Sequence, residues 1–281
     1  MKNKKTKIAL IAVLLTIILV CVYSGWQNSA IEITEYTICN SKIPSDFDGF
    51  RIVQISDLHN ATFGKDNGKL LDKIKDISPD IICITGDIID SRNTDAAVAL
   101  KFVTQALKIA PCYYVTGNHE QRVSEYSQLK QKMQNVGVFV LENKKDYIYK
   151  GAEYIVIAGI TEPSFETEKN FNQICDKNIK SINIKKDDFV VLLSHRPELF
   201  ETYVLNKIDL VLTGHAHGGQ IRLPYFGGIY APGQGAFPEY DTGTFEKDGT
   251  TMIVSRGLGN SIFPVRVNNR PEIVLIELNK G

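Results

Sequence analysis

The sequence lacks the cysteine pairs, the charge excess and the repeats that are typical of several protein classes. Its 5 cysteines are an odd number and form no C-x-x-C pair, so neither a zinc ribbon nor a thioredoxin-type motif is indicated. Its 32 basic and 32 acidic residues balance to zero, so no basic excess indicates nucleic-acid binding. There is no internal repeat, low-complexity stretch or clear linker. The composition is therefore that of an ordinary globular protein.

One long apolar run is present, at the N-terminus. It covers residues 8–23, slightly fewer than the ~20 residues that span a bilayer, but residues 24–26 extend it and Trp26 suits a membrane interface. Lysines flank only its N-terminal side, at positions 2, 4, 5 and 7. The positive-inside rule therefore predicts a single-pass signal anchor over residues 1–26 at the cell membrane, with the following domain outside the cytoplasm. A cleaved signal, which would give a secreted protein, is the alternative, although no A-x-A site follows.

The rest of the chain is predicted to form one α/β domain. Residues 27–48 indicate a connector with a short strand at 31–37, and residues 49–281 the domain itself. Apolar runs at 51–56, 80–85 and 112–116 alternate with helical patterns at 70–77 and 95–109. This βαβαβ pattern predicts parallel strands with right-handed crossovers. Further strands at 154–160, 188–194, 209–213, 251–255 and 272–278, with helices near 122–135 and 166–180, predict two packed sheets with helices outside.

Five of these strands end in residues that can bind metals. The strand ends carry D-L-H, G-D, G-N-H-E, a lone histidine and G-H-A-H, at residues 57–59, 86–87, 117–120, 195 and 214–217. Strand C-termini of an α/β sheet face one edge, so these groups are expected to converge there. All 5 histidines of the chain are among them. Carboxylate, imidazole and amide ligands suit ions such as Mn, Fe, Zn or Co, and the lack of thiolates argues against structural zinc.

These motifs, in this order, resemble the signature of the calcineurin-like metallophosphoesterase superfamily, which is D-x-H, G-D, G-N-H-D/E, H and G-H-x-H. The resemblance extends from about residue 50 to the end of the chain. It implies that residues 49–281 form a four-layer α/β/β/α sandwich, with two mixed sheets flanked by helices. It also implies hydrolysis of a phosphomonoester, phosphodiester or pyrophosphate bond.

The resemblance further implies a dinuclear metal centre, with Mn expected first and Fe, Zn or Co as alternatives. One ion would be bound by Asp57, His59, Asp87 and His217. The other would be bound by Asp87, Asn118, His195 and His215, with Asp87 bridging the two. A hydroxide shared by the two ions would attack phosphorus in line. His119 corresponds to the general acid for the leaving oxygen, and Asp90 to a carboxylate that orients it.

One departure from the superfamily pattern bears on the substrate. In the phosphoprotein phosphatase branch an arginine directly follows the GDxxD aspartate, whereas here Ser91 follows Asp90 and Arg92 comes one place late. This argues against a protein phosphatase. The C-terminal part instead resembles a bacterial membrane-associated branch related to enzymes that hydrolyse UDP-2,3-diacylglucosamine. Arg222, Arg256 and Arg266 are therefore candidates for contacts to a phosphate or lipid headgroup, and a structural or surface role is the alternative for each.

The expected substrate is a phosphorylated small molecule, a nucleotide or a lipid-linked phosphate that the anchored domain can reach. A non-catalytic binding or scaffold protein on the same fold is the alternative. Such proteins usually lose ligands, whereas all seven ligand positions here hold residue types that bind metals.

Overall fold

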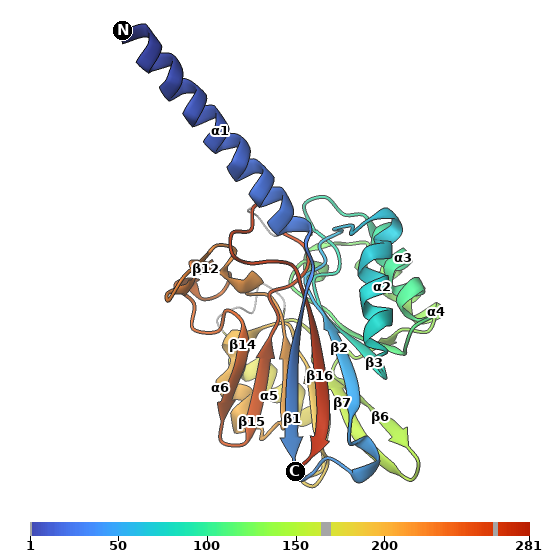
Figure 1. Cartoon of the computed structure of the whole chain (residues 1–281). Coiled ribbons are helices and arrows are strands. Elements are labelled where there is room, and N and C mark those ends of the chain that lie inside the picture. The colour runs from blue at the N-terminus through green and yellow to red at the C-terminus, as the bar shows by residue number, and fades with distance from the viewer. Residues whose placement is uncertain (1, 164–169, 261–263) are drawn as a thin grey trace.

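The computed structural model describes residues 2–163, 170–260 and 264–281, and its core consists of two six-stranded sheets (Figure 1). The first sheet contains, in spatial order, β1 (Glu32–Asn40), β16 (Glu272–Lys280), β2 (Phe50–Ile55), β3 (Ile81–Thr85), β4 (Cys112–Val115) and β5 (Phe139–Val140). The second contains β14 (Gly243–Lys247), β15 (Thr250–Val254), β9 (Leu210–Thr213), β8 (Val190–Leu193), β7 (Glu153–Gly159) and β6 (Lys144–Lys150). Both sheets are mixed, because β16 runs antiparallel to β2, and β14 and β6 are antiparallel edge strands.

Helices cover the outer face of each sheet, and this arrangement gives four layers. The helices α2 (Gly68–Ile77), α3 (Ala96–Ala106) and α4 (Tyr126–Asn135) pack on the first sheet. The helices α5 (Phe171–Ser181) and α6 (Phe200–Leu205) pack on the second. The prediction of an α/β sandwich of two mixed sheets flanked by helices is therefore confirmed.

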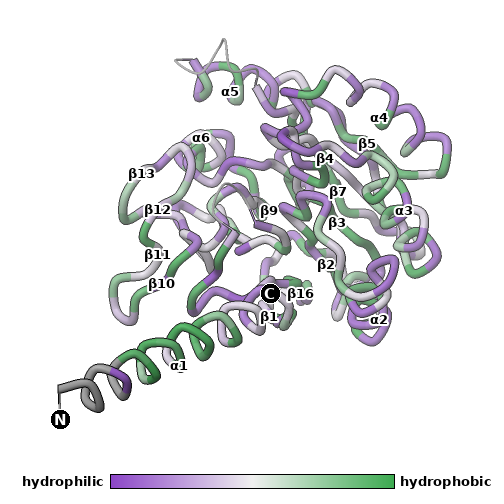
Figure 2. The backbone as a smooth tube through the Cα atoms, turned by 90° about the horizontal axis from the view of Figure 1, so that it is seen from above, coloured by the Kyte–Doolittle hydropathy of each residue, from purple (hydrophilic) through white to green (hydrophobic). Residues whose placement is uncertain are grey.

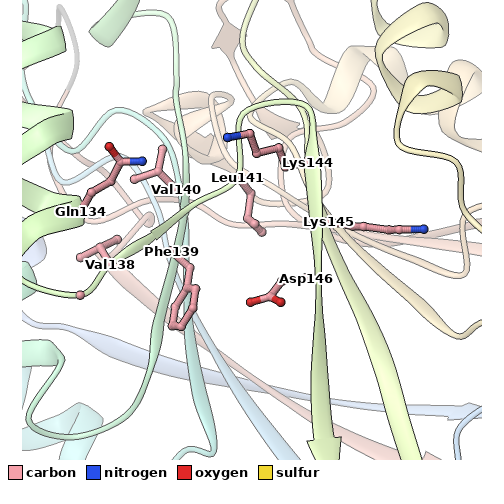
Figure 3. A pocket seen from close by; sticks show the side chains of 9 residues that line it. Gln134, Val138, Phe139, Val140, Leu141, Lys144, Lys145 and Asp146 are labelled. Atoms are coloured by element: carbon pink, nitrogen blue, oxygen red, sulfur yellow. The ribbon is translucent and has the colours of Figure 1, made fainter.

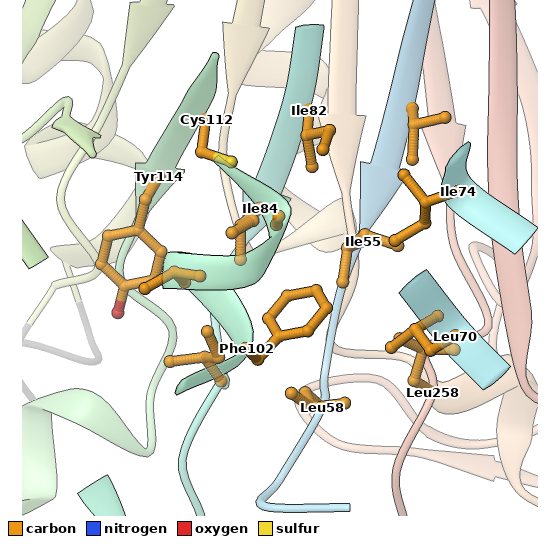
Figure 4. Close-up of a cluster of buried hydrophobic side chains, with 14 of the residues drawn as sticks. Ile55, Leu58, Leu70, Ile74, Ile82, Ile84, Phe102, Cys112, Tyr114 and Leu258 are labelled. Atoms are coloured by element: carbon orange, nitrogen blue, oxygen red, sulfur yellow. The ribbon is translucent and has the colours of Figure 1, made fainter. Parts of the chain in front are cut away.

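The central strands are buried on both faces, which explains their continuous apolar sequences. On β3, Ile82 and Ile84 face the helices, whereas Ile81 and Cys83 face the second sheet. Figure 4 shows the cluster on the helix side, where Phe102 of α3 lies among aliphatic side chains from the strands. The strand ends of both sheets are thus held by packing on two sides.

The predicted strands and helices of the domain are present, with ends that differ by a few residues. The strand expected at 31–37 belongs to β1, which pairs in parallel with β16 over its whole length. The first sheet therefore begins inside the segment expected to be a connector. The helix expected near 166–180 is α5, and residues 166–169 lie outside the described residues. The edge strands β6 and β14 and the short helix α6 are not predicted from the sequence.

The helix α1 (Lys2–Ser29) projects away from the sandwich (Figure 1). Its segment Leu10–Ser29 is long and apolar enough to cross a membrane, and 6% of its apolar window is buried against the rest of the chain. Figure 2 shows hydrophobic residues following one another along this helix. The predicted apolar N-terminal helix is confirmed.

Candidate metal centre

The seven predicted ligands lie just beyond the C-terminal ends of parallel strands from both sheets. In the first sheet they follow β2, β3 and β4, and in the second they follow β8 and β9. They are Asp57, His59, Asp87, Asn118, His195, His215 and His217, and all seven are buried. The strand-end pattern seen in the sequence thus brings residues as far apart in the chain as Asp57 and His217 to one place.

A first group of ligands combines two residues that follow β2 with one that follows β9. The Nε2 atoms of His59 and His217 lie 3.2 Å apart. Asp57 Oδ1 lies 3.4 Å from His217 Nε2 and 3.8 Å from His59 Nε2. The three residues therefore offer one oxygen and two nitrogens that converge within 4.8 Å of one another.

A second group lies beside the first, and Asp87 stands between them. Its Oδ2 atom is 3.2 Å from His195 Nε2 and 3.6 Å from His59 Nε2. His195 Nε2 is also 3.1 Å from His215 Nδ1 and 3.3 Å from Asn118 Oδ1. Asp87 thus brings one carboxylate oxygen close to an imidazole ring of each group, as a bridging ligand must.

The local chemistry fits divalent cations. His195 Nδ1 donates to the carbonyl of Thr85 at 2.8 Å, which leaves the lone pair of Nε2 free for a metal, as is usual for ligating histidines. Glycines let the backbone approach both carboxylates: a Cβ on Gly117 would lie 2.2 Å from Asp87 Oδ1, and one on Gly214 would lie 2.4 Å from Asp57 Oδ2. A set of oxygen and imidazole donors suits ions of the Mn, Fe, Zn or Co type.

The backbone at the ligands is strained. Five ligand residues adopt positive φ angles between 47° and 66°, namely Asp57, His59, Asp87, His215 and His217. Such left-handed conformations cost about 1–3 kcal/mol each for residues other than glycine and persist where the surroundings impose them, often at functional sites. These five conformations therefore lower the stability of the fold, and they direct the five side chains toward one another.

The electrostatics of the cluster favour bound positive charge. Burial raises the pKa of the Asp87 carboxyl, but the adjacent His195 and other histidines outweigh this effect and hold the pKa well below its ordinary value. Burial lowers the pKa of His195, but the charge of Asp87 outweighs it and raises the pKa to about 10. Burial lowers the pKa of His217 to about 3. The charged carboxylate of Asp87 and the neutral ring of His217 are in the protonation states that metal ligation requires, whereas His195 would release a proton when a metal binds.

Glu120 holds the backbone around the candidate ligand Asp87, and the sequence does not predict this role. Its buried carboxylate accepts the backbone N–H groups of Asp87 at 2.8 Å, Gly117 at 2.7 Å and Ile89 at 3.2 Å. Burial raises its pKa to about 7. One feature of the sequence could have indicated this role: Glu120 stands in a strand-end motif whose residues are expected to be buried. A buried carboxylate needs several hydrogen-bond donors around it.

His119 lies at the edge of the first ligand group. Its ring meets that of His59 edge-on, with centroids 4.5 Å apart. Its Nδ1 accepts the backbone N–H of Ser91 at 3.0 Å, so the ring proton of the neutral form is on Nε2. Asp90 Oδ1 is 3.4 Å from the same Nδ1, while Arg92 binds the Asp90 carboxylate with its Nε and Nη2 at 3.0 and 2.6 Å. The expected neighbours are thus brought together, with Arg92 as a third partner.

The three arginines expected to bind substrate all have protein partners. Arg222 donates to Asp241 at 2.7 Å, and Arg256 donates to Glu272 at 2.8 Å. Arg266 is fully buried and donates to main-chain carbonyls, including that of Arg256 at 3.0 Å. Their role in substrate binding stays a prediction.

Arg196 is a buried cation beside the second ligand group that the sequence analysis missed. Its guanidinium lies between Glu162 at 2.5 Å and Glu198 at 2.8 Å, and its Nη1 is 3.5 Å from His215 Nε2. The signal was its position directly after the ligand His195. It can hold the outer edge of the His215 ring in place.

A separate hollow lies between the edges of the two sheets (Figure 3). It is lined by Gln134, Gly137, Val138, Phe139, Val140, Leu141, Lys144, Lys145 and Asp146. None of these is a predicted ligand, and a lone carboxylate beside two lysines does not make a cation site. The metal chemistry of the described residues is therefore concentrated at the strand ends.

Comparison with known proteins agrees with this geometry. Residues 50–219 match the model of the calcineurin-like phosphoesterase family. The chain is 32% identical over 258 residues to the uncharacterized metallophosphoesterase YkuE of Bacillus subtilis, covering 88% of this chain and 85% of that protein. It is 24% identical to a transmembrane protein with metallophosphoesterase domain of Danio rerio, covering 89% of this chain and 58% of that protein.

A solved structure supports the fold. TT1561 of Thermus thermophilus superposes with a TM-score of 0.52 at 12% identity, covering 74% of this chain and 90% of that one. Since a family model and a relative above 30% identity both match most of the domain, the chain is a phosphate-ester hydrolase that belongs to the calcineurin-like phosphoesterase family.

Proposed function

We propose that the chain is a membrane-anchored phosphoesterase with a dinuclear metal centre at the strand ends. The observation that carries the proposal is the position of Asp87, whose Oδ2 lies 3.2 Å from His195 and 3.6 Å from His59. The proposed ligands are the seven residues described above, with residues 49–281 as the catalytic domain and residues 27–48 as its connector to the anchor. Mn is the first choice of metal, with Fe, Zn or Co as alternatives.

Two such ions would supply positive charge for the phosphate oxygens and lower the pKa of the attacking water. The chain itself supplies orientation and a proton. Protonation of the leaving oxygen would come from Nε2–H of the doubly protonated His119 ring, whose second proton would sit on Nδ1 near Asp90 Oδ1 at 3.4 Å. Nδ1 would then release the N–H of Ser91 that it accepts in the neutral form. Asp90, held by Arg92, is a positioning residue that favours positive charge on the ring as the phosphate binds.

The proposed substrates are phosphomonoesters, phosphodiesters or pyrophosphates on a nucleotide or a lipid. A lipid-linked substrate such as UDP-2,3-diacylglucosamine is included because α1 would hold the domain close to headgroups. The lysines at the start of α1 support a location of the domain outside the cytoplasm. Protease added to intact cells should then digest the domain, and digestion only after lysis would contradict this orientation.

The central experiment compares two histidine variants of the full chain in detergent. His119→Asn should keep the metal content, measured by elemental analysis, and slow hydrolysis by ~10²–10⁴-fold, the usual worth of general acid help. The loss should be smallest for p-nitrophenyl phosphodiesters, whose leaving group needs little protonation. His217→Asn should instead lower the metal content and slow all substrates alike.

Several outcomes would contradict the proposal. Metal loss in His119→Asn, or equal slowing of good and poor leaving groups, would refute the role of His119. A wild-type protein that holds metal but hydrolyses nothing in a panel of mono-, di- and pyrophosphate esters would favour the scaffold alternative.

A further inference from the structure

Two small hairpins beside the metal centre carry a concentration of exposed apolar side chains. They are β10 (Arg222–Leu223) with β11 (Gly227–Gly228), and β12 (Tyr230–Ala231) with β13 (Gly235–Ala236). Five of the nine large hydrophobic residues exposed outside α1, among the described residues, lie here: Leu223, Tyr225, Phe226, Tyr230 and Phe237. Residues 223–237, called here the aromatic hairpins, contain no charged residue. An exposed apolar patch of this kind marks a contact surface.

The aromatic hairpins lie next to the end of α1. Tyr23 of α1 donates its hydroxyl to Asn268 Oδ1 at 2.7 Å, and Asn268 Nδ2 donates to the carbonyl of Arg222 at 3.3 Å. In Figures 1 and 2 α1 extends from the domain toward the side that carries β12, and the view from above shows it running beside the hairpins. The hairpins and the apolar helix thus face the same side of the molecule.

The end of α1 is also bonded to the segment next to the ligand His217. Asn269 donates its backbone N–H to Gln27 Oε1 at 3.2 Å and its side-chain amide to the carbonyl of His217 at 2.7 Å. Arg270 lies over the ring of Trp26 at 5.3 Å. Contacts at several points therefore set the direction of the helix relative to both the hairpins and the metal centre.

The chemistry of this side matches a lipid bilayer. The apolar window of α1 is 6% buried, so the rest of the chain does not cover it. Trp26 and Tyr23 at its end are 52% and 40% exposed, and Trp and Tyr are enriched where a membrane helix meets water. The hairpins continue this aromatic composition without a charge that would oppose entry into the headgroup region.

We propose that the aromatic hairpins are a second membrane contact, which enters the bilayer interface beside α1 and holds the rim of the metal centre against the lipid headgroups. The contact would stop the domain from swinging freely on its anchor. A phosphoester displayed at the membrane surface would then reach the ligands without leaving the bilayer.

Fluorescence of the full chain in phosphatidylcholine vesicles tests this contact independently of hydrolysis. Trp26→Phe with Phe226→Trp gives a single tryptophan at the hairpin tip, and Trp26→Phe with Tyr149→Trp is the matched control. Tyr149 is a 67% exposed aromatic residue on β6, which lies at the end of the domain away from α1 (Figure 1). Vesicles made with brominated acyl chains should quench the fluorescence of the hairpin variant and leave that of the β6 variant unchanged. Thermal melting should verify that both variants are folded.

Equal fluorescence of the hairpin variant in brominated and plain vesicles would overturn the proposal. If quenching is absent and Tyr225→Ser with Phe226→Ser turns a dimer into a monomer, the patch belongs to a second copy of the chain, and the membrane contact is again refuted. This proposal rests on the proposed anchoring by α1, and the wild-type chain, whose one tryptophan is Trp26, tests that anchoring separately in the same vesicles. An unquenched hairpin beside a quenched Trp26 refutes the second contact alone, and neither result bears on whether the metal centre hydrolyses phosphoesters.

Discussion

Replacing Glu120 with glutamine tests whether this carboxylate holds the backbone of the metal centre. Glu120 Oε2 accepts the N–H groups of Asp87 and Gly117, and Oε1 accepts that of Ile89. In Glu120→Gln the amide oxygen can keep the first two bonds, but the amide NH2 then faces the N–H of Ile89. One buried donor left without a partner costs about 1–3 kcal/mol.

Two further effects change the expected loss in the free energy of unfolding, and they act in opposite directions. The two retained bonds lose the charge of the acceptor, and charge-assisted hydrogen bonds are roughly twice as strong as neutral ones. The variant also avoids the cost of burying a carboxylate, which is large enough to raise the pKa of Glu120 to about 7. We expect these effects to offset each other, so that the net loss stays at about 1–3 kcal/mol.

The assays are thermal melting and metal titration in one detergent. At ~2–4 °C per kcal/mol for a domain of this size, the melting temperature should fall by about 2–12 °C. Metal affinity should fall by roughly 10–100-fold, as for other residues that orient ligands from behind. The control is Glu125→Gln, an exposed glutamate on the same loop whose side chain accepts a hydrogen bond from the Ser124 hydroxyl, and it should change neither quantity. A Glu120→Gln protein that melts and binds metal like the wild type would refute the reasoning.

Three further outcomes are expected. Gly117→Ala should displace Asp87 and lower the metal content, because the added Cβ would lie 2.2 Å from Asp87 Oδ1. The control Gly68→Ala should be neutral or slightly stabilising in thermal melts, because its Cβ would have no neighbour within 4 Å and its φ is helical. Arg266→Lys should lower the free energy of unfolding by about 1–3 kcal/mol and leave KM unchanged, because lysine cannot bond to all the acceptors that the buried guanidinium reaches. A raised KM at an unchanged free energy of unfolding would instead support substrate contact. Chelation should lower the melting temperature and abolish hydrolysis, and added Mn should restore both; activity that survives complete metal removal would contradict the metal centre.

The sequence predicts the sandwich and the convergence of the candidate ligands well because both depend on local patterns. Each central strand is buried on two faces, so its apolar run is visible on its own, and each ligand follows such a run directly. The edge strand β6 has no comparable signal. Its sequence, KKDYIYK, is half exposed, and its strand conformation depends on antiparallel pairing with β7.

The missed residues depend on partners that are distant in the sequence. Glu120 accepts a hydrogen bond from the N–H of Asp87, a residue that lies 33 positions earlier in the chain. Arg256, expected at the substrate, bonds to Glu32 of β1, which is 224 positions away. The residue types were visible, but only the fold determines which donors and acceptors surround them.

The division of ligands between the sheets links metal binding to the packing of the whole domain. The first group takes Asp57 and His59 from the first sheet and His217 from the second, and the second group joins Asp87 to His195 in the same way. Each ion would therefore connect residues of the two sheets at the end of their shared apolar interface. Because an ion binds these ligands only when both sheets are in place, its binding free energy adds to the stability of the sandwich. The strain of the five left-handed ligand residues can be tolerated for that reason, and the metal-free domain should open first at the strand ends rather than at its apolar centre.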